Sequence, residues 1–380
     1  MKGKRVGVIG GGQLAWMMGA EAAKLNLDLI VQASSLEDPA VSRAKQVVLA
    51  DVDDASATAK LVDLCDVVTF ENEFIDLEAL QELKSEIFQP SLSSLAPLLD
   101  KYDQRQFLDG IGLPVPKFGL GLLQDEIAAD YGFPVVLKAR RHGYDGQGTF
   151  IVKNDRSLRE LSRRVPLAEL LVEELVSFDK ELAIIATRNM SGDTAVYPVT
   201  ETFQVSQVCH WTITPANINE DIVKRIKAIA TTILNELEVV GVFGIEFFLA
   251  KNNRVLVNEI APRTHNSGHY TLDGCQTSQF EMQLRAVTDM PLGSTDLKSA
   301  GAVMVNLLGF EESDSDYRSK RESILTIPHS FVHWYGKTSR PGRKLGHATV
   351  LLDAERLTQA QSIVSQIESI WYEGLINSKQ

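Results

Sequence analysis

Two glutamates in the segment IEFFLAKNNRVLVNEI have the types and spacing of a metal site. If Asn252 and Asn253 form a two-residue turn, which suits residues that adopt positive φ, Glu246 faces Glu259 across a β-hairpin. Directly paired Cβ atoms lie about 4.5–5.5 Å apart, so two like charges between apolar neighbours repel. A divalent cation such as Mg²⁺ removes the repulsion, and Asn258 adds a neutral oxygen ligand. A pair of solvent-facing glutamates, or one with a raised pKa, is the alternative interpretation.

The segment that follows, APRTHNSGHYT, carries many hydrogen-bond donors. Arg263, His265, Asn266 and Ser267 are more polar groups than a connection needs, so they favour an oxyanion or phosphate site beside the cation. A zinc site formed by His265 and His269 is disfavoured, because a glycine lies between them and the segment has no helical pattern.

A glycine-rich segment, KARRHGYDGQGT, lies between two β-rich runs. Gly143, Gly146 and Gly148 predict a loop at the tip of a hairpin, and the absence of the pattern G-x-x-x-x-G-K-[ST] excludes P-loop NTPases. With Lys138 at its entry, this loop is suited to close over a polyphosphate. A plain glycine-rich turn is the alternative.

Near the start of the chain, VGVIGGGQLAWM matches the fingerprint G-x-G-x-x-G/A through Gly10, Gly12 and Ala15. Such glycines let the backbone approach a phosphate at a helix N-terminus. NAD sites also have an acidic residue at the end of the second strand, where this chain has uncharged residues 32–34. The segment therefore predicts a phosphate-binding turn without NAD, and a purely structural turn stays open.

A basic cluster stands out in this acidic protein. The segment YGKTSRPGRKLGH gathers Lys337, Arg340, Arg343 and Lys344 around a Pro-Gly turn. It is suited to a phosphate group, and a solvated basic turn is the alternative.

The elements that position these residues change in character along the chain. Strands and helices alternate over the first hundred residues, including a helix through residues 40–46, and predict a parallel, doubly wound sheet with ligands at its carboxyl edge. A linker near residues 112–116 leads into a mostly antiparallel region. Isoleucines spaced three and four apart predict an amphipathic helix within residues 219–237, and strands and a final helix end the chain.

Composition limits the classes of protein. The 380 residues, 44% hydrophobic and 23% charged, are sufficient for two or three globular domains. The net charge of −12 argues against nucleic-acid binding. Three scattered cysteines indicate a reducing compartment, and no apolar stretch is long enough for a membrane span, so we expect a cytoplasmic protein.

In combination, GGGQLA, TFENEF, GYDGQGT, VNEIAPRTHNSGHYT and GRKLGHAT resemble the ATP-grasp superfamily and, within it, the 5-(carboxyamino)imidazole ribonucleotide synthases of purine biosynthesis. The resemblance covers nearly the whole chain and implies an α/β and α+β fold. It implies a doubly wound, Rossmann-like domain over 1–100, an ATP-grasp domain over 101–300 with a glycine-loop lid at about 117–176, and a C-terminal β-rich domain over 301–380. Thr264 and the segment ETFQVSQVCHWT depart from the family's usual pattern.

The resemblance also implies three sets of site residues. For ATP these are Lys101, Lys138, Gly143, Tyr144, Asp145, Gly146, Gln147, Gly148, Thr149, Glu173, Glu174, Leu175, Val176, Glu181, Gln204, Asn258 and Glu259, with Glu173 to Val176 lining the adenine pocket. For one or two Mg²⁺ ions they are Glu246 and Glu259. For the ribonucleotide they are Gln13, Leu14, Glu73, Tyr144, Arg263, His265, Asn266, Ser267, Lys337, Arg343 and Lys344.

The implied reaction is the carboxylation of 5-aminoimidazole ribonucleotide by ATP and bicarbonate through carboxyphosphate. Arg263 and Lys337 are expected to orient bicarbonate or stabilise the intermediate, and His265 to take the amine proton or orient a neighbour. A homodimer with no nucleic-acid or membrane partner is expected. The alternatives are a formate-dependent glycinamide ribonucleotide transformylase, a nicotinamide-dependent oxidoreductase, and a nucleotide-binding regulator without turnover.

Overall fold

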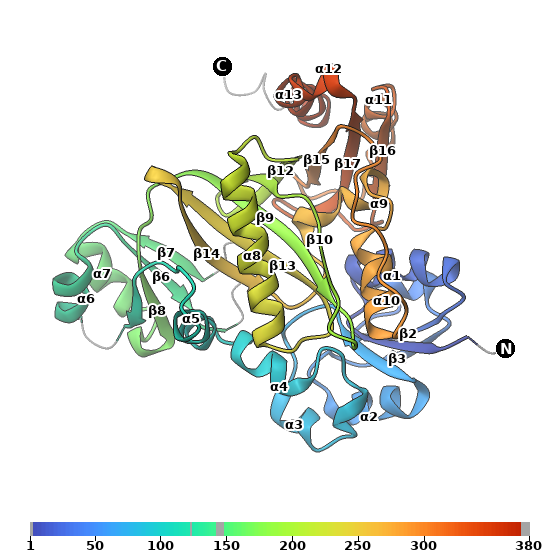
Figure 1. Ribbon diagram of the computed structural model, residues 1–380, viewed down its shortest axis with the longest axis horizontal. Helices are drawn as coiled ribbons and strands as arrows, with labels where there is room; N and C mark the ends of the chain where they lie inside the picture. Colours follow the sequence, from blue (N-terminus) through green and yellow to red (C-terminus); the bar gives the residue numbers. More distant parts are fainter. Residues whose placement is uncertain (1–2, 122–123, 142–147, 374–380) are drawn as a thin grey trace.

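The computed structural model describes residues 3–121, 124–141 and 148–373 (Figure 1). Its strands form three sheets: a parallel sheet at the N-terminus, a small antiparallel sheet, and a large antiparallel sheet that runs through the middle of the molecule. Among the described helices, none combines the length and the apolar character needed to span a bilayer.

The N-terminal sheet is parallel and covered on both faces, as predicted. Its strand order is β3-β2-β1-β4. Helix α1 packs on one face, and α2 and α3 pack on the other. The bounds are β1 Arg5–Ile9, α1 Gln13–Lys24, β2 Asp28–Ala33, η1 Pro39–Arg43, β3 Gln46–Leu49, α2 Ala55–Leu64, β4 Val67–Phe70 and α3 Leu77–Gln81. The helix predicted through residues 40–46 is only the short 3₁₀ helix η1, because the backbone becomes extended at Ala44.

A small antiparallel sheet of order β5-β8-β6-β7 lies within residues 117–176, the range predicted for the lid (Figure 1). Its elements are β5 Phe118–Leu120, α6 Gln124–Tyr131, β6 Val135–Ala139, β7 Thr149–Val152, α7 Asp155–Ser162, η4 Leu167–Glu169 and β8 Leu170–Glu174. Strands β6 and β7 pair antiparallel, which confirms the hairpin that carries the glycine-rich segment. Residues 142–147 of this segment lie outside the described part of the chain, among them the predicted site residues Gly143, Tyr144, Asp145, Gly146 and Gln147.

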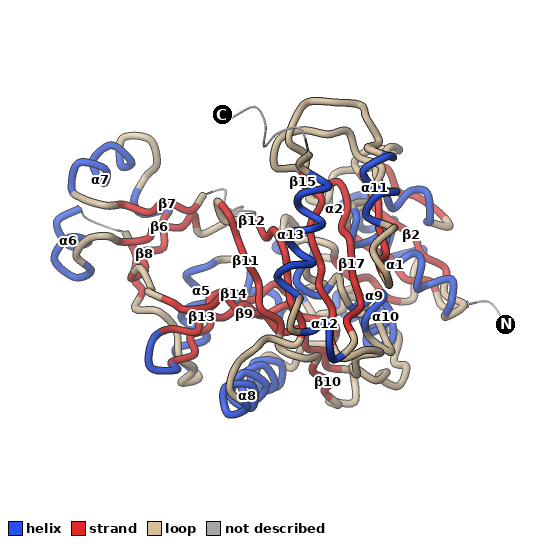
Figure 2. Tube along the Cα trace, turned by 90° about the horizontal axis from the view of Figure 1, so that it is seen from above, coloured by secondary structure: helices blue, strands red, loops and turns tan. Residues whose placement is uncertain are grey.

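The large sheet has the order β14-β13-β9-β11-β12-β15-β17-β16, and β10 pairs with β9. Its strands are β9 Phe178–Arg188, β10 Thr194–Val196, β11 Thr200–Val205, β12 Val208–Thr214, β13 Gly241–Ala250, β14 Arg254–Ala261, β15 Gly301–Leu308, β16 Ser330–Trp334 and β17 Lys344–Leu352. Because β15 pairs with β12, the predicted C-terminal region continues the sheet of the central region (Figure 2). The division of the chain at residue 300 stays a prediction.

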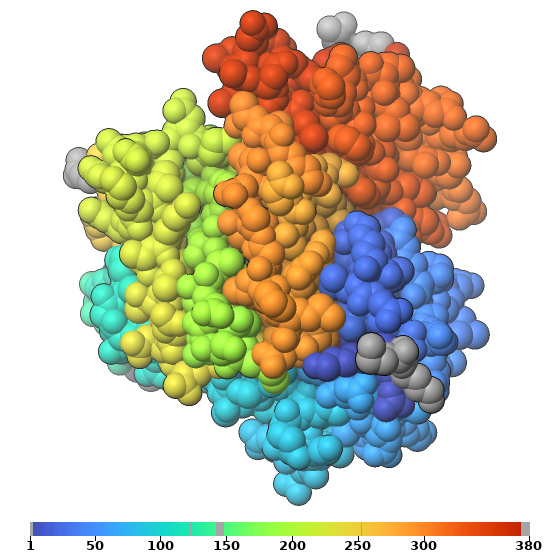
Figure 3. Space-filling model, turned by 45° about the vertical axis from the view of Figure 1, so that its right-hand side comes forward, coloured from blue at the N-terminus to red at the C-terminus, as the bar shows by residue number. Residues whose placement is uncertain are grey.

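Helices join these sheets into one body. On α8, the predicted apolar stripe of Ile222, Ile226, Ile229 and Ile233 is buried against the large sheet. Helix α10 packs against α1, so residues of the orange segment lie beside the blue N-terminal segment in Figure 3. The remaining bounds are η2 Ser85–Ile87, α4 Leu92–Leu95, η3 Ala96–Leu98, α5 Lys101–Gly110, α8 Glu220–Glu236, η5 Lys251–Asn253, η6 Asn266–Gly268, α9 Thr271–Gly274, α10 Gln279–Val287, α11 Arg318–Ile324, α12 Ala354–Leu357 and α13 Ala360–Trp371.

Candidate active site

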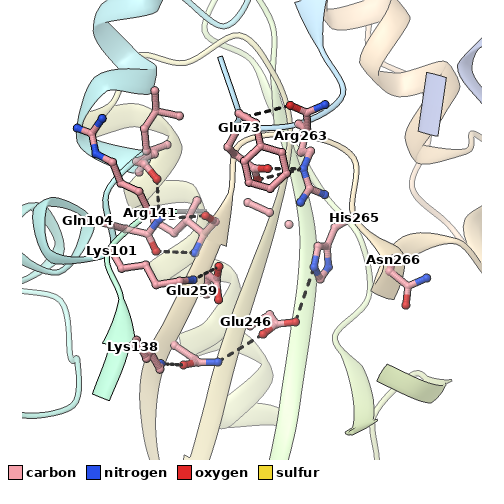
Figure 4. A pocket seen from close by; sticks show the side chains of 18 of the residues that line it. Glu73, Lys101, Gln104, Lys138, Arg141, Glu246, Glu259, Arg263, His265 and Asn266 are labelled. Carbon is pink, nitrogen blue, oxygen red and sulfur yellow. Dashed lines mark hydrogen bonds and ion pairs between the residues drawn. The ribbon is translucent and has the colours of Figure 1, made fainter. Parts of the chain in front are cut away.

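A cleft of about 1030 Å³ lies between the three sheets. Its walls come from the glycine turn before α1, the lid sheet and the hairpin β13–β14. Figure 4 shows Lys138 of the lid sheet and Glu246 and Glu259 of the hairpin pointing into one space. It brings together Gln13, Leu14, Glu73, Lys101, Lys138, Thr149, Glu173, Glu174, Leu175, Val176, Glu181, Gln204, Glu246, Asn258, Glu259, Arg263, His265, Asn266 and Lys344. Of the other described candidates, Gly148, Ser267, Lys337 and Arg343 are not on its wall.

Glu246 and Glu259 face each other across β13 and β14, as predicted, but the hairpin reaches this pairing differently. The turn is the three-residue η5 and not a two-residue turn, so Ala250 pairs with Arg254. With this one-residue change in register alone, Glu246 would no longer pair with Glu259. A β-bulge at Asn258 adds one residue to β14 and restores the pair.

The two carboxylates have different electrostatic surroundings. Burial, the charge of Glu259 and the charge of Glu181 raise the pKa of Glu246 to about 7. Burial acts against ionisation of Glu259 as well, but the Lys101 ammonium, which is hydrogen-bonded to Glu259 Oε1, lowers its pKa. Among the described residues, no lysine or arginine forms an ion pair with Glu246; Asn258 Nδ2 and His265 Nε2 lie 3.4 and 3.7 Å from its oxygens.

This donor set fits a magnesium ion. Mg²⁺ is bound by one or two carboxylates together with phosphate oxygens and water, and the opposed carboxylates of Glu246 and Glu259 offer that chemistry. Burial and the neighbouring carboxylates raise the pKa of Glu246, and a cation bound between Glu246 and Glu259 would favour the ionised form.

We expect Mg²⁺ to stabilise the protein more at pH 8 than at pH 6. The pKa of Glu246 is raised from 4.5 to about 7 in the folded protein, so its contribution to stability is present below pH 4.5 and is lost as the pH rises through about 7. Above pH 7 the ionised carboxylate is free to bind the metal, whereas below it a proton must be displaced. Melting temperatures with and without Mg²⁺ at both pH values measure this difference, and Glu246→Gln should reduce it. An equal Mg²⁺ effect at both pH values would contradict this assignment.

Lys138 is held by a buried ion-pair network. Its ammonium lies 2.7 Å from Glu173 Oε2 and 3.2 Å from Asn258 Oδ1. Arg105, also buried, donates to Glu173 Oε1 and to the backbone carbonyl of Asn258. Burial alone would raise the pKa of Glu173, but Arg105 and Lys138 lower it to about 2. The Glu173 carboxylate is therefore engaged in orienting Lys138, and the place of Glu173 in the adenine pocket stays a prediction.

The other end of the cleft holds the predicted ribonucleotide residues. Arg263 forms an ion pair of 3.0 Å with Glu73, and the charge of Glu73 keeps the pKa of Arg263 high despite burial (Figure 4). Ser267 Oγ lies 2.8 Å from His265 Nδ1, so this serine contacts the histidine and not the cleft. Lys337 is likewise not on the cleft wall. Its ammonium donates a hydrogen bond to Oε1 of Gln13, which is on the wall.

Two further predicted residues form hydrogen bonds within the protein. Arg343 donates to the carbonyl of Thr338 at 3.0 Å, within the predicted basic turn. Asn266 exchanges amide hydrogen bonds with Asn306. Across the described ranges, no group of three or more His, Cys, Asp or Glu residues is arranged to hold a metal, and His269 is buried beside Gln279.

Sequence reasoning missed three residues of the site. Arg105 and Gln104 lie on α5, and Gln104 forms hydrogen bonds with the backbone of Ile260, which follows Glu259 on β14. In the sequence these two residues lie in the polar run KYDQRQF before the lid. That run predicts a helix but does not indicate its contacts. Glu71 directly follows β4, but its partner could not be inferred from spacing.

Glu71 changes the interpretation of the glycine turn. Its carboxylate accepts hydrogen bonds from the N–H groups of Gly12, Leu14 and Ala15 at the start of α1. These amides are the donors that we predicted to cradle a phosphate. The expectation of a phosphate bound directly on this helix start is therefore wrong.

Comparison with known proteins defines the class. Residues 3–96 match the ribonucleotide synthetase preATP-grasp domain, residues 106–280 the ATP-grasp domain, and residues 302–361 the phosphoribosylaminoimidazole carboxylase C-terminal domain. Together with the lid and the carboxylate hairpin, these matches make the protein an ATP-grasp ligase.

Individual relatives narrow the class to one family. N5-carboxyaminoimidazole ribonucleotide synthase of Synechococcus elongatus is 51% identical over 97% of this chain and 95% of its own length. The structure of the synthetase from Thermotoga maritima is 40% identical, covers 97% of this chain and 98% of its own, and superimposes with a TM-score of 0.87. An Aspergillus clavatus synthase in complex with ADP and 5-aminoimidazole ribonucleotide is 29% identical over 97% and 99%, with a TM-score of 0.89. The chain belongs to the N5-carboxyaminoimidazole ribonucleotide synthase family.

Proposed function

We propose that this protein carboxylates the amine of 5-aminoimidazole ribonucleotide with bicarbonate, using ATP, in purine biosynthesis. The observation that carries the proposal is a single cleft with two chemically different ends. One end holds the opposed carboxylates Glu246 and Glu259 with Lys101 and Lys138, and the other holds the Glu73–Arg263 pair. The Aspergillus clavatus relative forms a complex with ADP and 5-aminoimidazole ribonucleotide, which supports binding of both kinds of molecule by this chain.

At the ATP end, the chain supplies positive charge where a triphosphate accumulates negative charge. Lys138 is fixed by Glu173 and Asn258, and Lys101 by Glu259, so both ammonium groups are already oriented. Glu246 and Glu259 would hold Mg²⁺, which supplies further neutralisation of the phosphate oxygens. Positioning and charge stabilisation are the main contributions of a protein to phosphoryl transfer.

Bicarbonate becomes an electrophile only after phosphorylation. One bicarbonate oxygen bonds to the γ-phosphorus as the bond to ADP breaks, which gives carboxyphosphate. The amine nitrogen then bonds to the carboxyl carbon, and phosphate leaves with the bridging oxygen. We assign Arg263, which pairs with Glu73, and Lys337, which donates to Gln13, to orienting bicarbonate or stabilising the intermediate. The lid would exclude water from the labile intermediate.

The amine must lose a proton when it attacks. His265 Nδ1 is tied to Ser267 Oγ at 2.8 Å, which leaves Nε2 directed toward Glu246 Oε1 at 3.7 Å. We assign the transfer of this proton to His265, because an imidazole is suited to both accepting and releasing a proton near neutral pH.

The proposal predicts substrate-dependent ADP release. With ATP and Mg²⁺, bicarbonate plus 5-aminoimidazole ribonucleotide should release ADP, whereas formate plus glycinamide ribonucleotide should give only the background rate. The reverse result would assign the protein to the formate-dependent transformylase. A fluorescence assay of NAD binding tests the oxidoreductase alternative, and absence of binding would reject it. The lack of an acidic residue at positions 32–34 already disfavours that alternative. No turnover with either pair would favour the regulator without catalysis.

Oxygen labelling tests the intermediate in the same assay. Bicarbonate carrying ¹⁸O should transfer one labelled oxygen to inorganic phosphate for each ADP formed. Unlabelled phosphate would contradict the carboxyphosphate route.

We also propose that the protein is a homodimer in the cytoplasm. Sedimentation of the purified chain measures its oligomeric state.

A further inference from the structure

The glycine turn before α1 is bonded to a carboxyl group that belongs to the protein itself. Burial raises the pKa of Glu71, and the N–H groups that it accepts from and the charge of Lys337 act in the opposite direction. Glu71 follows β4, which lies beside β1 in the N-terminal sheet. Gly12 N–H donates to Glu71 Oε2 at 2.5 Å, and the N–H groups of Leu14 and Ala15 donate to Oε1 at 2.9 and 3.4 Å. Gly12, at the N-cap position of α1, has no side chain that could cap the helix. The carboxylate of Glu71, from the segment after β4, accepts the hydrogen bonds that an N-cap side chain would accept.

The glycines of the fingerprint are shaped around this carboxylate. A Cβ atom on Gly12 would lie 2.5 Å from Glu71 Oε1, and one on Gly10 would lie 2.7 Å from Oε2. Gly10 also has a φ of +120°, which L-residues rarely adopt. The pattern that resembles a dinucleotide fingerprint is therefore required by the approach of Glu71.

We propose that Glu71 is a positioning residue of the ribonucleotide site: it occupies the anion position at the start of α1, keeps the substrate phosphate out of it, and orients Gln13 and Leu14 toward the cleft. This inference rests on the proposed function. Glu71 contacts the amides on both sides of Gln13 and is itself buried, so the conformation of this turn depends on it.

Gln13 connects the turn that Glu71 holds to a lysine of the C-terminal region. The side chain of Gln13 accepts a hydrogen bond from the Lys337 ammonium. Because Glu71 fills the helix start, the phosphate of the ribonucleotide must be neutralised by side-chain cations. Lys337, Arg343 and Lys344 are basic residues of the C-terminal region whose charges interact with one another. A dinucleotide phosphate is excluded from the turn by the same carboxylate, since two anions would share one set of donors.

Glu71→Gln tests the inference, with Glu21→Gln as the matched control. Glu21 is also a buried carboxylate, but it lies further along α1 and pairs with Lys24 away from the cleft. The amide introduced by Glu71→Gln retains the shape of the side chain but places an NH₂ group against N–H donors. We expect the KM for 5-aminoimidazole ribonucleotide to rise at least tenfold and the KM for ATP to stay within twofold. Glu21→Gln should change neither.

Acetate rescue of Glu71→Ala separates positioning from a role in folding alone. Removing the side chain opens a site beside the cleft that retains the three amide donors, so acetate should bring the ribonucleotide KM back toward the wild-type value, whereas chloride at equal ionic strength should not. An unchanged ribonucleotide KM in Glu71→Gln, or a loss of folding that acetate does not reverse, would overturn the inference. If the wild-type protein does not turn over this ribonucleotide, the proposed function itself fails, which is a separate result.

Discussion

Glu246→Gln is expected to lower Mg²⁺-dependent ATP turnover by about 10²–10³-fold, while the hairpin β13–β14 stays folded. The amide retains the size of the side chain but removes the charge that would hold the metal opposite Glu259. Initial rates of ADP release at saturating Mg²⁺ and ATP measure the effect, and circular dichroism checks the fold.

The matched control for this variant is Glu201→Gln. Glu201 is a partly buried glutamate on β11 of the same sheet, and it pairs with Lys180 at 2.5 Å without being on the wall of the cleft. We expect its turnover to remain within threefold of the wild-type rate. Near-normal turnover by Glu246→Gln would remove the metal assignment.

Glu173→Gln is expected to reduce the free energy of unfolding by about 3–5 kcal/mol, because it leaves two buried cations without their shared anion. Arg105 and Lys138 both contact this carboxylate, and together they lower its pKa to about 2. Turnover should fall as well, since Lys138 loses the partner that orients it. Urea unfolding and ADP release measure the two effects.

An exposed ion pair provides the comparison. Arg156 and Glu160 lie one turn apart on α7 at 3.0 Å, with both side chains largely exposed. Glu160→Gln should cost less than about 0.5 kcal/mol, because solvent screens such pairs. If Glu173→Gln were no more destabilising than Glu160→Gln, the buried network would not be a structural element of the site.

The sequence predicted the layout of the fold well, because its elements follow local rules. The parallel N-terminal sheet follows from the alternation of strand and helix, and the apolar stripe of α8 follows from the spacing of Ile222, Ile226, Ile229 and Ile233. The Glu246–Glu259 pairing was predicted correctly from a wrong turn. A three-residue turn and a bulge at Asn258 shift the register in opposite directions and cancel.

The contacts of the site were harder to predict, because they join distant segments. Glu71 caps a helix that begins almost sixty residues earlier, and Arg105 reaches Glu173 from another element. No spacing rule connects such pairs. A glycine fingerprint looks the same whether its donors bind a substrate phosphate or a carboxylate of the protein.

The central claim is that Glu246 and Glu259 hold the metal that binds ATP in this cleft. A crystal structure with Mg²⁺ and a non-hydrolysable ATP analogue tests it most directly. We predict a magnesium ion between the two carboxylates, with the terminal phosphates close to Lys138. Carboxylates turned away from each other, or an analogue bound outside the space between the lid sheet and β13–β14, would contradict the claim.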